Sequence, residues 1–324
     1  MMTDNFSFCY QNVVRKCNNF FMKGSSWEEC LGLYVEKVQV GVVRKDIVEK
    51  LVQFPDIFEV VKADSEGNEK PPGVYLSQYL LLPEDRTKAL DHVMRVLRQQ
   101  DELVALRGWR DEMYNVMRTF SGRPYFQVER AASSLIGVMT YGVHINGYTY
   151  SPDGKLMMWI GHRSKSKPTY PDMYDNMSAG GLTAGLSVME CALKECSEEA
   201  AVPDEHLKHL KQVGLVSCCY ENEKGVFPEN LFVFDLELPA DFKPVNRDGE
   251  MDTFYLLPLD KVKELIIGDG FKPNCALVIL DFFIRHGIIT ADSEPNYCLL
   301  VEQLHVPLQT IFSKFDKHQF CIPT

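Results

Sequence analysis

The sequence lacks long apolar runs, an excess of basic residues and paired cysteine motifs. No run of eighteen apolar residues occurs, and the longest apolar stretch, at residues 276–284, is interrupted by Asp281, so no membrane-spanning helix is expected. The formal net charge of −11 is opposite in sign to the surface that nucleic-acid binding requires. We therefore expect neither nucleic acid nor membrane as a partner. The acidic protein can still bind a small anionic ligand if a bound divalent cation makes the electrostatic potential at the binding site positive.

The ten cysteines contain no C-x-x-C pair, so neither a zinc site nor a redox motif is expected. We expect reduced and mostly buried thiols, with the adjacent Cys218 and Cys219 serving to pack the core. The N-terminus lacks the basic-then-apolar layout of a secretory signal and the arginine content of a transit peptide. The cytosol is the expected location, and no pattern in the sequence determines the oligomeric state.

Hydrophobic residues make up 45% and charged residues 24% of the 324 residues, which is the composition of a folded globular protein. This length is sufficient for two domains, each with its own core. In the first hundred residues the clearest helix is expected at 87–100, where apolar residues recur at helical spacing. The pattern changes near Val128, so we predict a mixed α+β domain over residues 1–125 and a second domain over residues 126–324.

The second domain shows strand patterns at residues 143–150, 155–161, 213–220, 231–238 and 253–257. Pro152-Asp153-Gly154 separates the first two patterns and predicts a hairpin, because proline presets φ and glycine accepts a positive φ. A polar loop is expected at 163–176, and helices at 187–202, from about 260, and at 276–286. Strands and helices in this order predict an α/β or α+β sandwich.

The helix expected at residues 187–202 has a defined start and a defined apolar face. Ser187 is followed three residues later by Glu190, which is the pattern of a capping box. At the helical angle of 100° per residue, one stripe is expected to pack on the sheet, and it consists of Met189, Leu193, Cys196 and Ala200.

Glu195, Glu198 and Glu199 fall on an arc beside that stripe. Carboxylates at this spacing repel one another unless a cation lies among them, and oxygen ligands favour Mg²⁺ or Mn²⁺. A glycine-rich turn, Gly180 to Gly185, precedes the helix and lets backbone groups approach a ligand. Each feature taken alone also fits a simpler interpretation, a solvated helix face in the first case and a tight turn in the second.

The glycine turn and the glutamate helix together resemble the Nudix box. That pattern runs Gly, five residues, Glu, seven residues, Arg-Glu, an aliphatic residue, any residue, Glu-Glu, any residue, Gly and an aliphatic residue. The matching residues are Gly180, Glu195, Glu198, Glu199 and Val202. The departures are Leu186 for the first Glu, Lys194 for Arg, and Ala201 for the last Gly. All three metal-binding glutamates of the family are retained, whereas a lysine cannot hold a carboxylate through a bidentate fork.

Four further segments resemble the Nudix branch related to the fungal thiamine pyrophosphokinase fusion proteins, namely residues 141–148, 159–163, 167–176 and 274–287. The N-terminal part, including residues 108–112, resembles the uncharacterised domain that precedes Nudix in that branch. The resemblance covers most of the chain. It implies a Nudix α/β/α sandwich with a mixed sheet, preceded by a smaller α+β domain.

The resemblance also implies Mg²⁺-dependent hydrolysis of a diphosphate by water attack at phosphorus, with Mn²⁺ as the other ion that fits. Glu195, Glu198 and Glu199 are the implied metal-ligating and catalytic residues. The carbonyl of Gly180 or Ala179 is an implied further ligand, since the family uses a backbone oxygen at this place.

Several residues outside the helix are candidates with two interpretations each. Glu229, just before the strand expected at 231–238, is either an extra metal ligand or a surface residue, and Glu250 is a weaker candidate of the same kind. Arg163, Lys167 and the backbone of Gly181 either bind the substrate phosphates or, for the two side chains, are solvated loop charges. No catalytic role is assigned to the expected turn formers Asp175 and Asn176 or to the expected strand residue His144.

For the substrate, the branch points to oxidised thiamine diphosphate derivatives, which would be hydrolysed to monophosphates. Oxidised nucleoside diphosphates such as 8-oxo-dGDP are the alternative substrates. Two other classes of function stay open: a non-catalytic sensor that binds a diphosphate in the same pocket, and an N-terminal interaction module with the Nudix domain as a scaffold. Retention of all three glutamates favours the enzyme over the sensor.

Overall fold

A computed structural model describes residues 3–62, 70–167 and 169–311. The described chain forms two compact units, and neither is continuous in sequence. Unit 1 contains residues 3–18, Tyr141–Cys218 and Asn230–Val306. Unit 2 contains Asn19–Thr140, Cys219–Glu229 and residues 307–311. Each unit consists of three separate segments, so these units do not test a single boundary at residue 125, which stays a prediction.

Unit 2 is built on a mixed four-stranded sheet in the order β2-β1-β4-β3. These strands are β1 (Leu31–Val35), β2 (Val38–Val43), β3 (Phe58–Val61) and β4 (Gly73–Leu76). Helices α2 (Lys45–Leu51) and α3 (Pro83–Gln99) contribute to its core, together with the hairpin β5 (Met113–Val116) and β6 (Phe126–Glu129). Helix α3 confirms the expected helix at 87–100 but begins earlier, because proline is favourable in a first helical turn. The remaining elements are four short 3₁₀ helices and α9 (Leu308–Ile311).

The second sheet follows the order β11-β12-β7-β8-β13. Its strands are β7 (Thr140–Tyr150), β8 (Leu156–Arg163), β11 (Lys211–Asn222), β12 (Gly225–Glu237) and β13 (Met251–Pro258). Two short strands join it: β9 (Tyr174–Asp175) pairs with β8, and β10 (Ser178–Gly181) pairs with β7. The expected hairpin is confirmed, since β7 pairs antiparallel with β8 and Gly154 has a φ of 76° in the turn.

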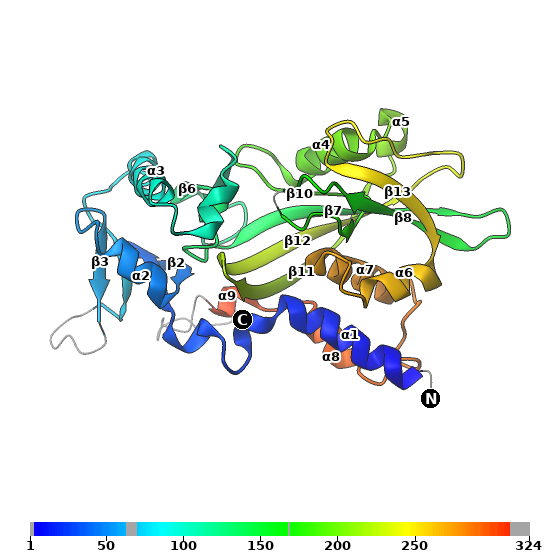
Figure 1. The fold of residues 1–324 in the computed structure, drawn as a ribbon, viewed down its shortest axis with the longest axis horizontal. Coiled ribbons are helices and arrows are strands. Elements are labelled where there is room, and N and C mark those ends of the chain that lie inside the picture. Colours follow the sequence, from blue (N-terminus) through cyan, green and yellow to red (C-terminus); the bar gives the residue numbers. More distant parts are fainter. Residues whose placement is uncertain (1–2, 63–69, 168, 312–324) are drawn as a thin grey trace. The chain divides into compact units, whose positions relative to one another are not determined.

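Helices cover both faces of this sheet within unit 1. Figure 1 shows α4 (Val188–Ala200) on one side and α6 (Leu259–Ile266) and α7 (Pro273–Arg285) on the other. Helix α1 (Thr3–Cys17) packs on α7 and on α8 (Tyr297–Gln303), and α5 (Asp204–Leu207) follows α4. The expected α+β sandwich is therefore confirmed. Within the described residues, no helix combines the length and the apolar content needed to cross a bilayer.

The register of β7 and β10 determines which residues face α4. Gly180 lies opposite Val143, and Ala179 lies opposite His144. A Cβ on Gly180 would meet Glu195 of α4, whereas the sulfur of Cys275 in α7 lies 3.6 Å from the ring of His144. Since side chains alternate along a strand, Gly180 faces α4 and Ala179 faces α7. Strand β10 therefore passes directly beneath the glutamate helix.

Two expectations about local structure are wrong in part. The segment 163–176 is not entirely a loop, because Arg163 ends β8 and residues 174–175 form β9. The expected apolar stripe of α4 is confirmed at Cys196 and Ala200 but not at Met189, which is 42% exposed. The other buried residues of the helix are Cys191, Ala192 and Glu199. The small side chains of Cys191 and Ala192 let the helix approach β10, where the Cys191 thiol lies 3.4 Å from the carbonyl oxygen of Gly181.

The expectation for the cysteines is confirmed among the described residues. These cysteines are free thiols, and Cys218 and Cys219 are completely buried in the core.

Candidate metal centre

The capping box fixes the start of α4. The backbone N–H of Glu190 donates to Ser187 Oγ over 3.2 Å, and the backbone N–H of Ser187 donates to Glu190 Oε2 over 2.8 Å. Both halves of the predicted motif are therefore present. The helix ends at Ala200, and Ala201 follows in the left-handed region with a φ of 51°. These ends define the length of the helix that carries Glu195, Glu198 and Glu199.

Glu199 is the buried acidic residue of α4. Its exposed fraction is 1%, and the backbone N–H of Ala179 donates to its Oε2 over 2.8 Å. Burial raises the pKa of Glu199 well above its usual value, and the nearby carboxyl groups of Glu195 and Asp175 raise it further. A carboxyl group in this environment favours either a proton or a cation beside it.

Glu195 occupies the space that the missing side chain of Gly180 leaves open. A Cβ at position 180 would lie only 2.2 Å from both Cδ and Oε1 of Glu195. The side chain of Glu195 is 14% exposed, and Lys194 Nζ lies 3.7 Å from its Oε1. The first glycine of the predicted motif therefore lets the helix carboxylate lie directly against strand β10.

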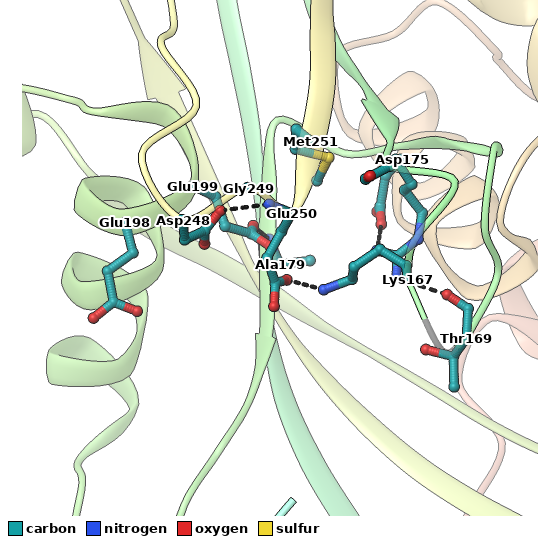
Figure 2. A network of polar contacts seen from close by, with 12 residues as sticks. Lys167, Thr169, Asp175, Ala179, Glu198, Glu199, Asp248, Gly249, Glu250 and Met251 are labelled. Carbon is teal, nitrogen blue, oxygen red and sulfur yellow. Dashed lines mark hydrogen bonds and ion pairs between the residues drawn. The ribbon is translucent and has the colours of Figure 1, made fainter.

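A loop before β13 brings two further carboxylates to Glu199. One ligand atom from each of Glu199, Asp248 and Glu250 can be chosen so that all lie within 4.8 Å of one another. The backbone N–H of Glu250 donates to Asp248 Oδ1 over 2.8 Å, and Gly249 between them has a φ of 80°. Figure 2 shows these side chains meeting between α4 and the start of β13. We call Glu199, Asp248 and Glu250 the acidic cluster.

Glu198 does not join the acidic cluster in this structure. Its side chain is 49% exposed and pairs with Lys194 over 2.9 Å, and Figure 2 shows it pointing away from Glu199. Lys194, which replaces the arginine of the motif, therefore lies between Glu198 and Glu195. The structure brings Glu195 and Glu199 together and leaves Glu198 at the rim.

Lys167 reaches the acidic cluster from the loop after β8. Its ammonium group forms an ion pair with Glu250, and its side chain is only 9% exposed, so it is not a solvated loop charge. Burial alone would raise the pKa of Glu250. The hydrogen bond and the charge of Lys167 outweigh that effect, and the pKa of Glu250 lies below its usual value.

Arg163 is buried and fully engaged by the protein. Its guanidinium group donates to Asp175 Oδ2 over 2.7 Å and to the carbonyl oxygens of Thr169 and Tyr170, each over 2.9 Å. Lys272 also pairs with Asp175, over 3.2 Å. Asp175 is completely buried, so the expectation of a simple turn former is wrong. This ion-paired anchor holds the loop that carries Lys167.

A chain of buried polar contacts continues from this anchor through the sheet. His144 Nδ1 lies 2.9 Å from Asn176 Oδ1, and Asn176 donates to Asn146 over 3.1 Å. Asn146 donates to Asp235 over 3.1 Å, and Arg285 pairs with Asp235 over 2.6 Å. His144 and Asn176 are therefore members of a buried network, and Asn176 is not a turn former at the surface.

Glu229 belongs to strand β12 and not to the segment before it, because β12 begins at Gly225. It belongs to unit 2, where the Tyr220 hydroxyl donates to its Oε1 over 3.1 Å. Its assignment as a metal ligand stays a prediction.

Two site residues had no role in the sequence analysis, namely Asp248 and Lys272. The signal for Asp248 is the tripeptide Asp248-Gly249-Glu250 before a strand, which points to both carboxylates equally. Lys272 carries no local signal, because its position beside Asp175 depends on where α7 begins relative to β9.

Comparison with known proteins identifies the family. Residues 10–140 match a family model described as a domain of unknown function, DUF4743. Nudix hydrolase 20, a chloroplastic protein of Arabidopsis thaliana, is 39% identical over 293 residues, which cover 90% of this chain and 76% of that protein. The chain belongs to the Nudix hydrolase family. Nudix hydrolase 24 of the same plant is 37% identical over 292 residues, with the same coverage of both chains.

A solved Nudix domain gives a weaker similarity. The Nudix domain of Shewanella oneidensis NrtR, complexed with ADP ribose, superposes with a TM-score of 0.37 at 14% identity. The superposition covers 47% of this chain and 90% of that chain.

Family membership confirms the predicted class of enzyme. As a Nudix hydrolase, the chain is a hydrolase that acts on diphosphate bonds. The domain that precedes the Nudix region is confirmed as well. The cytosolic location stays a prediction, since the names of both plant relatives specify the chloroplast.

Proposed function

We propose that this Nudix hydrolase binds Mg²⁺ at the acidic cluster and Glu195, and that it cleaves a diphosphate to a monophosphate and inorganic phosphate. One observation supports the proposal most strongly. Glu199 is almost completely buried, yet it lies among acidic groups, with Asp248 and Glu250 within 4.8 Å and Glu195 close enough to raise its pKa. Such a gathering of carboxyl groups is unfavourable unless a cation or a proton lies among them.

The residues present fit a hard divalent ion. All of the side-chain donors are carboxylate oxygens, which suit Mg²⁺ and Mn²⁺ and not softer metals. Among the described residues, no other group of His, Cys, Asp or Glu side chains reaches comparable proximity. Glu195 and Glu199 would hold the ion from α4, and Asp248 and Glu250 would hold it from the loop before β13. Glu198 and the carbonyl oxygen of Gly180 remain further proposed ligands.

A divalent ion bound here would neutralise the diphosphate oxygens and make a nearby water molecule more acidic. The side chains of the protein supply the rest. The N–H of Ala179 orients Glu199 over 2.8 Å. Because burial raises the pKa of Glu199, its carboxyl group holds a proton more readily than an exposed glutamate does. Lys167 and Lys272 bring positive charge to the same end of the sheet.

Oxidised thiamine diphosphate derivatives are the substrates that we propose. The support is the resemblance of residues 141–148, 159–163, 167–176 and 274–287 to the Nudix branch related to thiamine pyrophosphokinase fusion proteins. Residues 159–163 lie in β8, and 274–287 include most of α7, so the resemblance includes a strand of the sheet and a helix that covers it.

Phosphate release from a panel of diphosphates, with and without Mg²⁺, tests this function. The panel contains oxothiamine and oxythiamine diphosphate, thiamine diphosphate, 8-oxo-dGDP and dGDP. We expect Mg²⁺-dependent release that is fastest with the oxidised thiamine compounds. Faster release from 8-oxo-dGDP would reassign the substrate, and tight binding without release would show a sensor.

Glu199→Gln supplies the matching test of the site. We expect kcat to fall by roughly 10²- to 10⁴-fold, the range for losing a metal-binding or proton-transfer group. Glu205→Gln removes the same charge from a side chain that is 75% exposed on α5 and should leave kcat unchanged. Turnover of Glu199→Gln close to that of the wild type would remove Glu199 from the site.

A further inference from the structure

Lys167 and Arg163 are the basic residues of the loop region that were predicted to contact the substrate phosphates, and the structure gives them different roles. Arg163 donates to Asp175 and to the carbonyl oxygens of Thr169 and Tyr170. Its side chain is 6% exposed. A guanidinium group that makes these contacts cannot turn to a ligand without breaking its buried ion pair with Asp175, which is costly. Arg163 is therefore a fixed anchor of the loop.

Lys167 is attached in another way. Its ammonium group makes one ion pair, with Glu250. The backbone holds the two segments together independently of that pair, because the N–H of Ser164 donates to the carbonyl oxygen of Glu250 over 3.0 Å and the N–H of Lys167 donates to that of Ser164 over 3.2 Å. The ammonium group can therefore leave Glu250 while the loop keeps its path.

The partner of Lys167 belongs to the acidic cluster. Glu250 lies within 4.8 Å of both Glu199 and Asp248, and Figure 2 shows Lys167 reaching it from the side opposite α4. An ammonium group and a divalent ion at this carboxylate repel each other, so each weakens the binding of the other. When an ion neutralises the cluster, the released ammonium group lies beside the place where the diphosphate is expected.

We propose that Lys167 is an exchangeable counterion, which neutralises Glu250 in the metal-free enzyme and moves to the terminal phosphate of the substrate when a divalent ion binds the acidic cluster. This inference rests on the proposed function. It makes Lys167 a competitor of the metal and a ligand of the phosphate, and it couples the two binding events. A lysine suits this role because its ammonium group is a compact charge on a flexible stem.

Titration of the metal-free full-length protein with Mn²⁺, followed by calorimetry without substrate, tests the competition. Lys167→Gln should bind Mn²⁺ roughly tenfold or more tightly than the wild type, because a repelling charge has been removed from a partly buried ligand. Lys165→Gln is the matched control, since Lys165 lies in the same loop, is 77% exposed and approaches Asp172 to within 3.8 Å. Its Mn²⁺ affinity should equal that of the wild type.

A second pair of variants isolates the contact with Glu250. In a Glu250→Gln background, Lys167→Gln should no longer tighten Mn²⁺ binding, because the carboxylate for which the two cations compete is gone. Lys167→Arg retains the charge and should retain the weak Mn²⁺ binding of the wild type. This variant distinguishes an effect of the positive charge from an effect of changing the side chain.

Steady-state kinetics at saturating Mg²⁺ tests the second half of the proposal. For the best diphosphate of the panel, the KM of Lys167→Gln should rise roughly 10- to 100-fold, the loss expected for one charge-assisted hydrogen bond to phosphate. Unchanged Mn²⁺ affinity in Lys167→Gln, an equal change in Lys165→Gln, or an unchanged KM overturns the exchange. Absence of Mn²⁺ binding in the wild type overturns the proposed metal site itself.

Discussion

Gly180→Ala separates the geometry of the metal centre from the stability of the fold. A Cβ at this position would lie 2.2 Å from Cδ and Oε1 of Glu195, whereas ordinary contact begins at 3.4 Å. The carboxylate must therefore move by about 3.4 − 2.2 = 1.2 Å. A misplacement of about 1 Å in a catalytic site can cost roughly 10²-fold in rate. We expect kcat to fall by about that factor and Mn²⁺ binding to weaken.

Stability should respond differently, because the nearest atoms belong to the mobile end of a glutamate side chain and not to the backbone. Alanine also restricts the unfolded chain, which stabilises proteins by about 0.4–1 kcal/mol where the backbone conformation permits it. The free energy of unfolding in urea should therefore change by less than about 1 kcal/mol.

Gly214→Ala is the matched control, since a Cβ there, in β11, meets no atom within 4 Å. It should change neither kcat nor Mn²⁺ affinity. Wild-type turnover in Gly180→Ala would refute the placement of Glu195 in the centre. Unfolding of the variant would instead refute the idea that the carboxylate yields.

Three further predictions concern helix α4 and the buried network. Ser187→Ala should lower the free energy of unfolding by about 1 kcal/mol through the lost cap, and an unchanged urea midpoint would count against the capping box. Ala201→Gly should raise it by about 0.5 kcal/mol, since Ala201 has a φ of 51°; a loss of stability would contradict this. Burial, aided by the charge of Lys272, lowers the pKa of His144 to about 4. The unfolded chain therefore takes up a proton below about pH 6.5 that the folded chain takes up only near pH 4, so the contribution of His144 to stability is complete above pH 6.5 and declines as the pH falls. Between pH 7 and pH 5 this loss amounts to about 2 kcal/mol. His144→Gln should show a smaller loss over that range in urea titrations, and an equal loss would be inconsistent with a neutral buried imidazole.

Local signals accounted for much of the fold and for half of the site. The capping box at Ser187, the hairpin at Pro152-Asp153-Gly154 and the glutamates of α4 were readable because each depends on residues within one or two turns of chain. The same local reasoning misplaced part of the buried stripe of α4. Helical periodicity gives the width of an apolar face, but the rotation of the helix depends on the strand beneath it, and here Cys191 approaches Gly181.

The other half of the site depends on the sheet. Asp248 and Glu250 reach Glu199 because β13 pairs with β8 in a register that places Met251 opposite Arg163. No periodic pattern contains that register. The roles of Arg163 and Asp175 were hidden for the same reason, because a buried ion pair and two loop charges look alike in a sequence. Only the pairing of Gly161 with Asp175 brings the two side chains together.

Helix α1 packs on α7 and α8, although more than 250 residues separate α1 from α7 in the sequence. All three helices belong to unit 1, which also contains the metal centre. Tyr10, Val13 and Val14 of α1 are among its buried residues. A gene fragment that encodes only the portion after residue 140 would omit this helix and leave an apolar surface uncovered. The hydrolase can therefore be transplanted or expressed by itself only if its opening helix is restored. Recombination at a single crossover cannot exchange it as a module.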